Sequence, residues 1–318
     1  MRDFREDIVD LFDRKRGGHV QHWLYTDALR DTMSGADLWR AFTRSSQRYY
    51  IPEVETRLIR EKGPTMISSN EADTLVDFGV GSKSALIDKV MPVIRSLRSL
   101  RMYSGIDISQ HMLEIASKTV EELRPELEIE MQQKDFHYDP ICCGGKKHLG
   151  IVFGCSVSNQ EMMEGDGFPD EAIVNNLRHY REHLSAGDEM LVTYDMNPDE
   201  QKVKAAYDDP YWSRHVTGLM YDVDRLLKTD GDFDPTAWRH EMIWNDQVQV
   251  MHQCIVAEKA QSLIMGDRTF RFNQHQRFVA VNNFKFREAD FERLCVSAGF
   301  QVGRSEAEDS LRLQHLRI

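Results

Sequence analysis

The sequence predicts an α/β protein built on a Rossmann-like core. Segments typical of buried strands alternate with helix-like segments between residues 75 and 195. The strand-like segment Leu75–Val80 runs into a Gly-x-Gly turn at Gly79 and Gly81, and a second apolar segment ends in Asp107. Strand–helix alternation of this kind predicts a parallel sheet with right-handed crossovers.

Five strands are expected in this core, and the edge where they end is the place to look for function. They are Leu75–Val80, Met102–Ile108, Leu127–Gln132, His148–Cys155 and Glu189–Tyr194. Ligands in such sheets bind at the carboxyl ends of the strands. Functional residues should therefore directly follow these segments.

Composition and charge exclude several classes of partner. The chain has 318 residues, 41% hydrophobic and 29% charged, enough for one large domain or two closely connected ones. Its net charge of −12 argues against nucleic-acid binding. No run approaches the roughly 18 apolar residues of a membrane helix, and the start Met1-Arg-Asp-Phe lacks a signal-peptide core. We expect a cytoplasmic protein with no membrane partner.

Cysteines and histidines predict neither disulfides nor a metal. The five cysteines are an odd number without CxxC spacing, and the adjacent Cys142 and Cys143 lie in a loop-like stretch. His179 and His183 are four residues apart but lack the glutamate of a zincin helix. A solvated helix face is the preferred interpretation, and no metal is expected.

The glycine turn and two strand-end acids predict an adenosyl cofactor. Glycine lets the backbone turn tightly and lets a ligand approach closely. Asp107, about 25 residues beyond the turn, can accept hydrogen bonds from ribose hydroxyls. A third strand ends in Asp135-Phe136, an acid for an adenine amino group and a ring to pack on its face. Each feature alone is common in turns, but together, without a third glycine, they favour S-adenosylmethionine over NAD.

Two regions outside this alternation predict a lid. Residues 1–60 and 197–260 look mainly helical, whereas Val248–Lys259 and Thr269–Lys285 alternate like two long antiparallel strands. A helix beginning at Arg287 and a last strand pair ending through Arg312–Ile318 should complete the core. The expected division is a core of 62–196 plus 287–318 and a substrate-binding lid of 1–61 plus 197–286.

Several separated motifs carry a resemblance to a known family. They are Trp23-Leu-Tyr25, Gly35-Ala-Asp37-Leu-Trp39, Tyr49-Tyr50-Ile-Pro-Glu-Val-Glu55, Asp77-Phe-Gly79-Val-Gly81-Ser82, Gly154-Cys-Ser156-Val-Ser-Asn159, Ala206-Tyr207-Asp208-Asp209 and Lys285-Phe286. From about Trp23 to its end the chain resembles the histidine-specific Nα-methyltransferases of ergothioneine biosynthesis, with the dimethylallyltryptophan N-methyltransferases as wider relatives. The resemblance implies a class I methyltransferase core with a mixed α+β substrate-binding lid.

The resemblance also implies roles for individual residues. The implied cofactor-binding residues are Gly79, Gly81, Ser82, Lys83, Asp107, Ile108, Asp135, Phe136 and Gly154. The implied substrate-binding residues are Tyr25, Tyr49, Asn159, Tyr207, Met251, Val281 and Asn283, and Tyr25, Asn159 and Tyr207 are the implied catalytic residues. Taken alone, Asn159 is equally typical of a helix N-cap and Tyr207 of a core aromatic residue.

The chain departs from the family where the family recognises histidine. There, a glutamate and a serine in the last lid strand hold the imidazole, whereas this sequence has Val281 and Asn283. If the site lacks the groups that pair with the imidazole, a bound histidine has unpaired polar atoms. Its preference over other amino acids then falls by several kcal/mol, on the order of the cost of unpaired buried polar groups. Histidine is therefore not the expected substrate. The family's lysine after the glycine turn is also displaced, with Lys83 as the nearby candidate.

The sequence leaves three functions open. The favoured one is S-adenosylmethionine-dependent N-methylation of a free amino acid or small derivative other than histidine, with a side-chain nitrogen such as the arginine guanidino group slightly ahead. A guanidino substrate needs an orienting carboxylate, for which the candidates are Glu161, Asp195, Asp208 and Asp209. The alternatives are α-N-methylation of histidine and a catalytically silent homologue that binds cofactor or amino acid. The intact glycine turn, Asp107, Asn159 and Tyr207 argue against silence.

Overall fold

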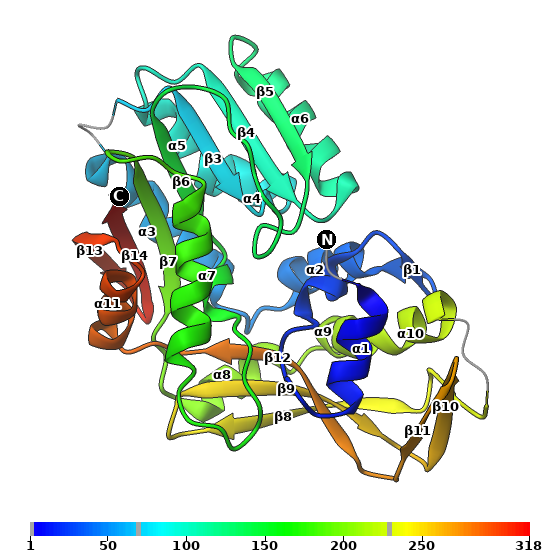
Figure 1. Cartoon of the computed structure of the whole chain (residues 1–318). Helices are drawn as coiled ribbons and strands as arrows, with labels where there is room; N and C mark the ends of the chain where they lie inside the picture. The colour runs from blue at the N-terminus through cyan, green and yellow to red at the C-terminus, as the bar shows by residue number, and fades with distance from the viewer. Residues whose placement is uncertain (1–2, 68–70, 228–230) are drawn as a thin grey trace.

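The fold is built around a seven-stranded sheet, seen in a computed structural model that describes residues 3–67, 71–227 and 231–318 (Figure 1). Its strand order is β13-β14-β7-β6-β3-β4-β5. The strands are β3 (Thr74–Phe78), β4 (Met102–Asp107), β5 (Glu128–Gln133), β6 (His148–Val152), β7 (Glu189–Asp195), β13 (Gln301–Glu308) and β14 (Leu311–Arg317). The two pairings of β14, with β13 and with β7, are antiparallel, and the other four pairings in this sheet are parallel. The predicted Rossmann-like α/β core is confirmed.

Helices cover both faces of the large sheet. One face packs on α3 (Ile51–Met66), α5 (Met91–Ser96) and α6 (Gln110–Leu123), and the other on α7 (Asp170–Glu182) and α11 (Glu288–Ser297). Successive residues of β3 pack on opposite faces of the sheet. Leu75 belongs to the hydrophobic cluster on the first face, and Val76 belongs to the cluster on the second face. A sheet buried on both faces needs continuous apolar strands, which explains why these segments were recognisable in the sequence.

Between β3 and α5 the chain forms two short helices, and a third follows β6. They are α4 (Lys83–Ala85), η2 (Leu86–Val90) and η3 (Ser156–Ser158). Ser82 caps α4 by accepting a hydrogen bond from the backbone N–H of Ala85 at 3.2 Å. These turns stand at the carboxyl ends of β3 and β6, where the sheet meets the rest of the molecule.

Most residues outside the large sheet and its helices, which we call the lid after the predicted division, lie below that sheet in Figure 1. They contain an antiparallel sheet ordered β12-β9-β8. Its strands are β8 (Trp238–Asn245), β9 (Val250–Ala257) and β12 (Arg277–Phe284), with a hairpin of β10 (Gln261–Met265) and β11 (Arg268–Phe272) beside them. The other lid elements are α1 (Phe4–Phe12), η1 (Gln21–Tyr25), β1 (Leu29–Arg30), β2 (Met33–Ser34), α2 (Gly35–Ser45), α8 (Glu200–Tyr207), α9 (Pro210–Thr217) and α10 (Leu219–Leu227).

Two expectations for the lid are wrong in detail. The stretch Thr269–Lys285 is not one strand, because a turn at 273–276, with His275 at φ 68°, separates β11 from β12. The region expected to be helical contains β8, an edge strand whose residues are mostly half-buried. Its partner is β9, and such pairing is decided by contacts across strands rather than by local pattern.

Helix α3 joins the two parts of the molecule. It packs on α5, β13 and β14 of the core, although residues 51–61 were expected in the lid. The division into core and lid remains a prediction, with part of the expected ranges (1–2, 68–70 and 228–230) outside the described residues. Among the described helices, none is both long and apolar enough to cross a membrane.

Candidate functional site

A cavity of about 290 Å³ lies between the carboxyl ends of β3, β4 and β6 and the lid. Core residues from the turns after these strands form one end, and lid residues from η1, α2, α8 and α9 form the other. The carboxyl ends of the strands, where the sequence predicts the functional residues, therefore form one wall of this cavity. Its two ends differ in chemistry.

The core end begins with the glycine turn. Gly79 has φ 97° and Gly81 has φ 63°, a conformation that side chains with a Cβ rarely adopt. A Cβ on Gly79 would stand 3.2 Å from Cε1 of Phe136. Both glycines and Phe136 line the cavity. The turn therefore needs glycine for its shape and for the approach of the Phe136 ring.

Asp107 lies beside this turn, at the end of β4. Burial raises the pKa of its carboxyl to about 6, although hydrogen bonds from the backbone N–H groups of Ser109 and Gly81 oppose the shift. The Ser109 bond measures 2.9 Å. A carboxylate that lines a cavity can accept hydrogen bonds from the two hydroxyls of a ribose, so Asp107 fits this part of an adenosyl group.

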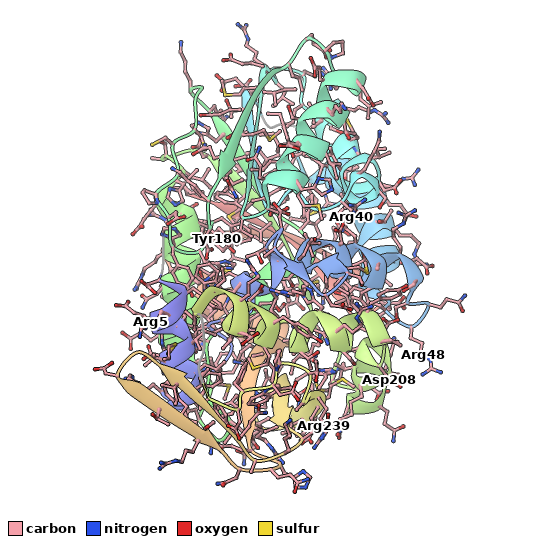
Figure 2. The ribbon with its side chains drawn as sticks, turned by 90° about the vertical axis from the view of Figure 1, so that its right-hand side faces the viewer. Arg5, Arg40, Arg48, Tyr180, Asp208 and Arg239 are labelled. Atoms are coloured by element: carbon pink, nitrogen blue, oxygen red, sulfur yellow. The ribbon has the colours of Figure 1, made fainter. Side chains whose placement is uncertain are left out.

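Asp135 follows β5 and stays ionised. Burial by itself raises the pKa of its carboxyl. The hydrogen bond from His137 and the proximity of His22 lower this pKa by more, so that the net result is a pKa of about 2. The backbone N–H of His137 donates to Oδ1 of Asp135 at 3.0 Å. The neighbouring Phe136 ring lies 6.0 Å from the ring of Tyr180 on α7, which Figure 2 labels. An acid and a ring at this position fit an adenine base.

The remaining expected cofactor residues divide into two groups. Ser82, Ile108 and Gly154 line the cavity. Lys83 does not: its side chain is 56% exposed and its Nζ lies 3.4 Å from Oε2 of Glu122 on the surface. The sequence pattern places Lys83 beside the turn, but Ser82 begins a helix there, and the lysine points outward from it.

Sequence reasoning missed a buried lysine that does line this end of the cavity. Lys89 of η2 is buried and its Nζ lies 2.5 Å from Oε2 of Glu55 on α3. The other carboxylate oxygen of Glu55 accepts from the Gly154 N–H at 2.5 Å and from the hydroxyl of Thr193. Glu55 thus ties α3 to the turn after β6. Nothing local to position 89 marks it, because its partner is 34 residues away.

Aromatic side chains form the lid end of the cavity. They are Tyr25, Trp39, Tyr49, Tyr207 and Trp212. Burial raises the pKa of the Tyr25, Tyr49 and Tyr207 phenols, so all three stay neutral. The ring centres of Tyr49 and Tyr207 lie 5.4 Å apart, and the hydroxyl of Tyr207 can donate a hydrogen bond to a ligand in the cavity. Electron-rich ring faces stabilise a cation within about 6 Å.

Asn159 and Asn283 meet at the boundary between the two ends. Asn159 directly follows η3, and its Oδ1 accepts a hydrogen bond from Nδ2 of Asn283 at 2.7 Å. Both line the cavity, whereas the other two residues expected at the substrate, Met251 and Val281, are buried and do not line it. Val281 faces Gln253 across the strand pair and packs in the core of the lid.

Lys285 is a second buried cation that the sequence placed in a motif but gave no role. Its side chain is 1% exposed, lines the cavity, and lies 2.8 Å from Oδ2 of Asp195. The Tyr50 hydroxyl donates to the same oxygen at 2.5 Å. Lys285 also lies 5.6 Å from the ring centre of Tyr207. The pair with Asp195 raises the pKa of Lys285 against the effect of burial, so the ammonium stays charged.

Gln21 also faces the cavity and was missed. Its Nε2 donates to the main-chain oxygen of Asn159 at 2.9 Å. Because a carbonyl oxygen accepts only, the other atom of the amide must be the acceptor Oε1. That oxygen is buried and has no hydrogen-bond partner within the described chain. A ligand N–H group is a suitable partner for it.

None of the four acids considered for a guanidino substrate lines the cavity. Asp195 is paired with Lys285, Asp209 caps α9, and Glu161 accepts from the hydroxyl of Tyr138 at 2.7 Å. Asp208 is exposed beside Arg48 at the edge of the lid (Figure 2), with a separation of 3.9 Å between Oδ2 and Nη1. Within the described chain, no group of three or more His, Cys, Asp or Glu side chains is placed to hold a metal.

The sheet order, the glycine turn and the two strand-end acids define an S-adenosylmethionine-dependent methyltransferase. The chain belongs to the family described as "Histidine-specific methyltransferase, SAM-dependent", which matches residues 4–316. The cofactor is therefore S-adenosylmethionine. The residues that the geometry offers to it, Gly79, Gly81, Asp107 and Asp135, fit its adenosyl group.

The chain is similar to individual methyltransferases at low sequence identity. The chain is 26% identical over 292 residues to a histidine N-alpha-methyltransferase of Mycobacterium tuberculosis, covering 89% of this chain and 84% of the relative. It is 25% identical over 288 residues to one of Mycolicibacterium smegmatis, covering 88% and 83%. A solved S-adenosylmethionine-dependent methyltransferase from Clostridium acetobutylicum aligns with a TM-score of 0.44 at 12% identity, covering 89% of this chain and 97% of that one.

Proposed function

We propose that this protein transfers a methyl group from S-adenosylmethionine to the α-amino nitrogen of a free amino acid other than histidine. The observation that supports it most is that one cavity joins the adenosyl-binding turns to an end walled by neutral tyrosines and tryptophans. A methyl acceptor held at that end faces the cofactor directly. Holding the two reactants in line contributes much of the rate in such a displacement.

The polar groups of the lid end suit the two charged groups of an amino acid. The ammonium of Lys285 and the hydroxyl of Tyr207 are donors for a carboxylate, and Oε1 of Gln21 is an acceptor for an amino group. Tyr25 is neutral, because burial raises the pKa of its phenol. Its oxygen can accept a hydrogen bond from the amine without acting as a strong base.

Charge is balanced across the reaction. When bound, S-adenosylmethionine supplies an electrophilic methyl group on a sulfonium; a neutral amine takes the methyl, and the positive charge moves to nitrogen. The aromatic walls favour a cation before and after the transfer. The amine must first lose a proton, since an ammonium has no lone pair.

The α-amino nitrogen is preferred to a guanidino nitrogen because, among the described residues, no unpaired carboxylate lines the lid end of the cavity. Glu55, which lines the cavity from α3, is already paired with Lys89. A guanidinium cation buried without an acid loses the bidentate partner that such sites supply. The four acids that the sequence offered are paired, capping or exposed. The slight preference for arginine drawn from the sequence therefore finds no support in the geometry.

Histidine is the second candidate, because the curated relatives are histidine N-alpha-methyltransferases. The side chain at position 281 argues against histidine as the substrate, because it is a valine buried within the lid core. An imidazole placed there would find no acid among the described residues that line the cavity's lid end.

A panel assay separates these candidates. The purified protein is incubated with S-adenosylmethionine and each common amino acid, and products are analysed by mass spectrometry with fragmentation to locate the methyl. We expect methylation at the α-nitrogen of an amino acid other than histidine. Methylated histidine as the main product supports the second candidate, methylation at a guanidino group contradicts the α-amino assignment, and no product on any amino acid rejects both.

A further inference from the structure

A chain of side-chain hydrogen bonds runs from the cavity wall into the lid core. Trp212 Nε1 lies 3.0 Å from one amide atom of Gln253, and the other amide atom of Gln253 lies 2.8 Å from Asn283. Asn283 in turn lies 2.7 Å from Asn159. Two amides in series, those of Gln253 and Asn283, therefore connect the indole of Trp212 on α9 to Asn159, which directly follows η3.

The indole decides which way every amide points. Because Trp212 Nε1–H only donates, the Gln253 atom facing it must be Oε1. Nε2 of Gln253 then faces Asn283, so the atom it meets must be the acceptor Oδ1. Nδ2 of Asn283 is consequently the donor to Asn159, whose Oδ1 is the acceptor.

A second donor holds Gln253 in this orientation. His240 Nε2 lies 2.7 Å from Oε1 of Gln253, and its Nδ1 lies 3.2 Å from the Ser213 hydroxyl. Burial lowers the pKa of His240, so the ring is neutral, with its proton on Nε2 and Nδ1 accepting from Ser213. Gln253 itself is fully buried and does not line the cavity.

The consequence lies at the cavity end of the series. With Oδ1 engaged by Asn283, Asn159 has its Nδ2 donor left for a ligand, and no hydrogen bond from this nitrogen occurs within the described chain. Lys285 stands two residues beyond Asn283, on the same face of the extended chain, and Tyr207 lies against it. All three present donors, and donors of this number suit a carboxylate.

We propose that Gln253 is a positioning residue that sets the polarity of Asn283 and Asn159, so that Asn159 binds the carboxylate of the amino acid through its N–H group. This inference rests on the proposed function, since it names the group of the substrate that this site takes. It makes Asn283 a polarity relay in this chain rather than a contact for the substrate side chain.

Gln253→Glu tests the relay because it inverts it. A carboxylate at 253 still accepts from Trp212 and His240, but it has no donor for Asn283. Asn283 must then turn its Nδ2 to position 253, and Asn159 must turn Oδ1 to the cavity. The probes are glycine and glycinamide, which share the α-end and lack a side chain, titrated calorimetrically into protein saturated with S-adenosylhomocysteine.

We expect the wild type to bind glycine about ten- to a hundredfold more tightly than glycinamide, the range for hydrogen bonds to a charged group. In Gln253→Glu this preference falls at least about tenfold, because the amide of glycinamide can donate to Oδ1 of Asn159. Asn283→Asp inverts the same bond from the next position and serves if the first variant fails to fold. Gln301→Glu, an exposed change of equal charge on β13, is the matched control and keeps the wild-type preference.

Three results overturn the relay. The first is a wild type that binds neither probe or binds both equally. The second is a preference for glycine that is unchanged in both inverting variants. The third is an equal loss of affinity for both probes, which indicates a merely structural role for Gln253. Because the assay measures binding, it separates the two proposals. A preference that depends on Gln253, with no methylated product in the amino-acid panel, leaves the relay standing and rejects the proposed function.

Discussion

Lys285→Met should destabilise the protein more than any exposed charge change. The lysine and Asp195 are 1% and 0% exposed and 2.8 Å apart, so the variant leaves a carboxylate buried without its cation. Removing one partner of a buried pair costs about 3–5 kcal/mol. Asp195 keeps donors from the Tyr50 hydroxyl at 2.5 Å and the Asn197 N–H at 3.0 Å, so we expect the lower end, about 3 kcal/mol.

The assay is urea unfolding of the cofactor-free protein, followed by tryptophan fluorescence. The double variant Lys285→Met with Asp195→Asn removes the orphaned charge and should recover about 2 of the 3 kcal/mol, because the buried amide needs only ordinary hydrogen bonds. Lys204→Met, which breaks an exposed pair with Glu200, is the control and should change stability by less than about 0.5 kcal/mol. A loss below about 1 kcal/mol in the single variant, or no recovery in the double variant, refutes the buried-pair reasoning.

Three further predictions concern the cofactor end and the thiols. Gly79→Ala should lower the free energy of unfolding by about 1–2 kcal/mol and weaken cofactor binding in calorimetry, because Gly79 has φ 97°. Gly167→Ala, where the added Cβ meets open space, is the control and should change neither quantity. The affinity for S-adenosylmethionine should be retained above pH 6 and fall by up to about tenfold per unit below it, because burial raises the pKa of Asp107 to about 6 and ribose hydroxyls bind the ionised form. The same titration in Asp107→Asn should be flat; a parallel decline would assign the pH dependence to another group. With Ellman's reagent one thiol should react fast and disappear in Cys142→Ser, since Cys142 is exposed and burial raises the pKa of Cys143 to about 11; two fast thiols would contradict this.

The core and the cofactor end of the cavity were predictable because their signals are local. Gly79 and Gly81 follow an apolar strand directly, and Asp107 ends the next one. Parallel strands of one sheet bring such positions to the same edge whatever the details of packing. The Lys83 expectation failed to reach the cavity for a related reason, since the direction of a side chain depends on the helix that begins at Ser82.

The lid end depended on contacts between distant segments. The sequence around β8 predicts a helix, whereas the structure has a strand there that is defined by its pairing with β9. Lys89 pairs with Glu55, and Lys285 pairs with Asp195, although the partners are far apart in the sequence. No short pattern marks a lysine as buried, since that depends on an acid from elsewhere arriving beside it.

By itself the sequence determined the class of fold, the cofactor and the family, because strand periodicity, glycine turns and strand-end acids act over a few residues. Only the tertiary structure decided what the substrate end presents. In the structure, Val281 lies in the lid core and the four candidate acids do not line the cavity. Asn159 is connected by hydrogen bonds through Asn283 and Gln253 to the indole N–H of Trp212. The physical reason is that the polarity of an amide is set by the partner it meets, and these partners come from separate elements brought together by packing.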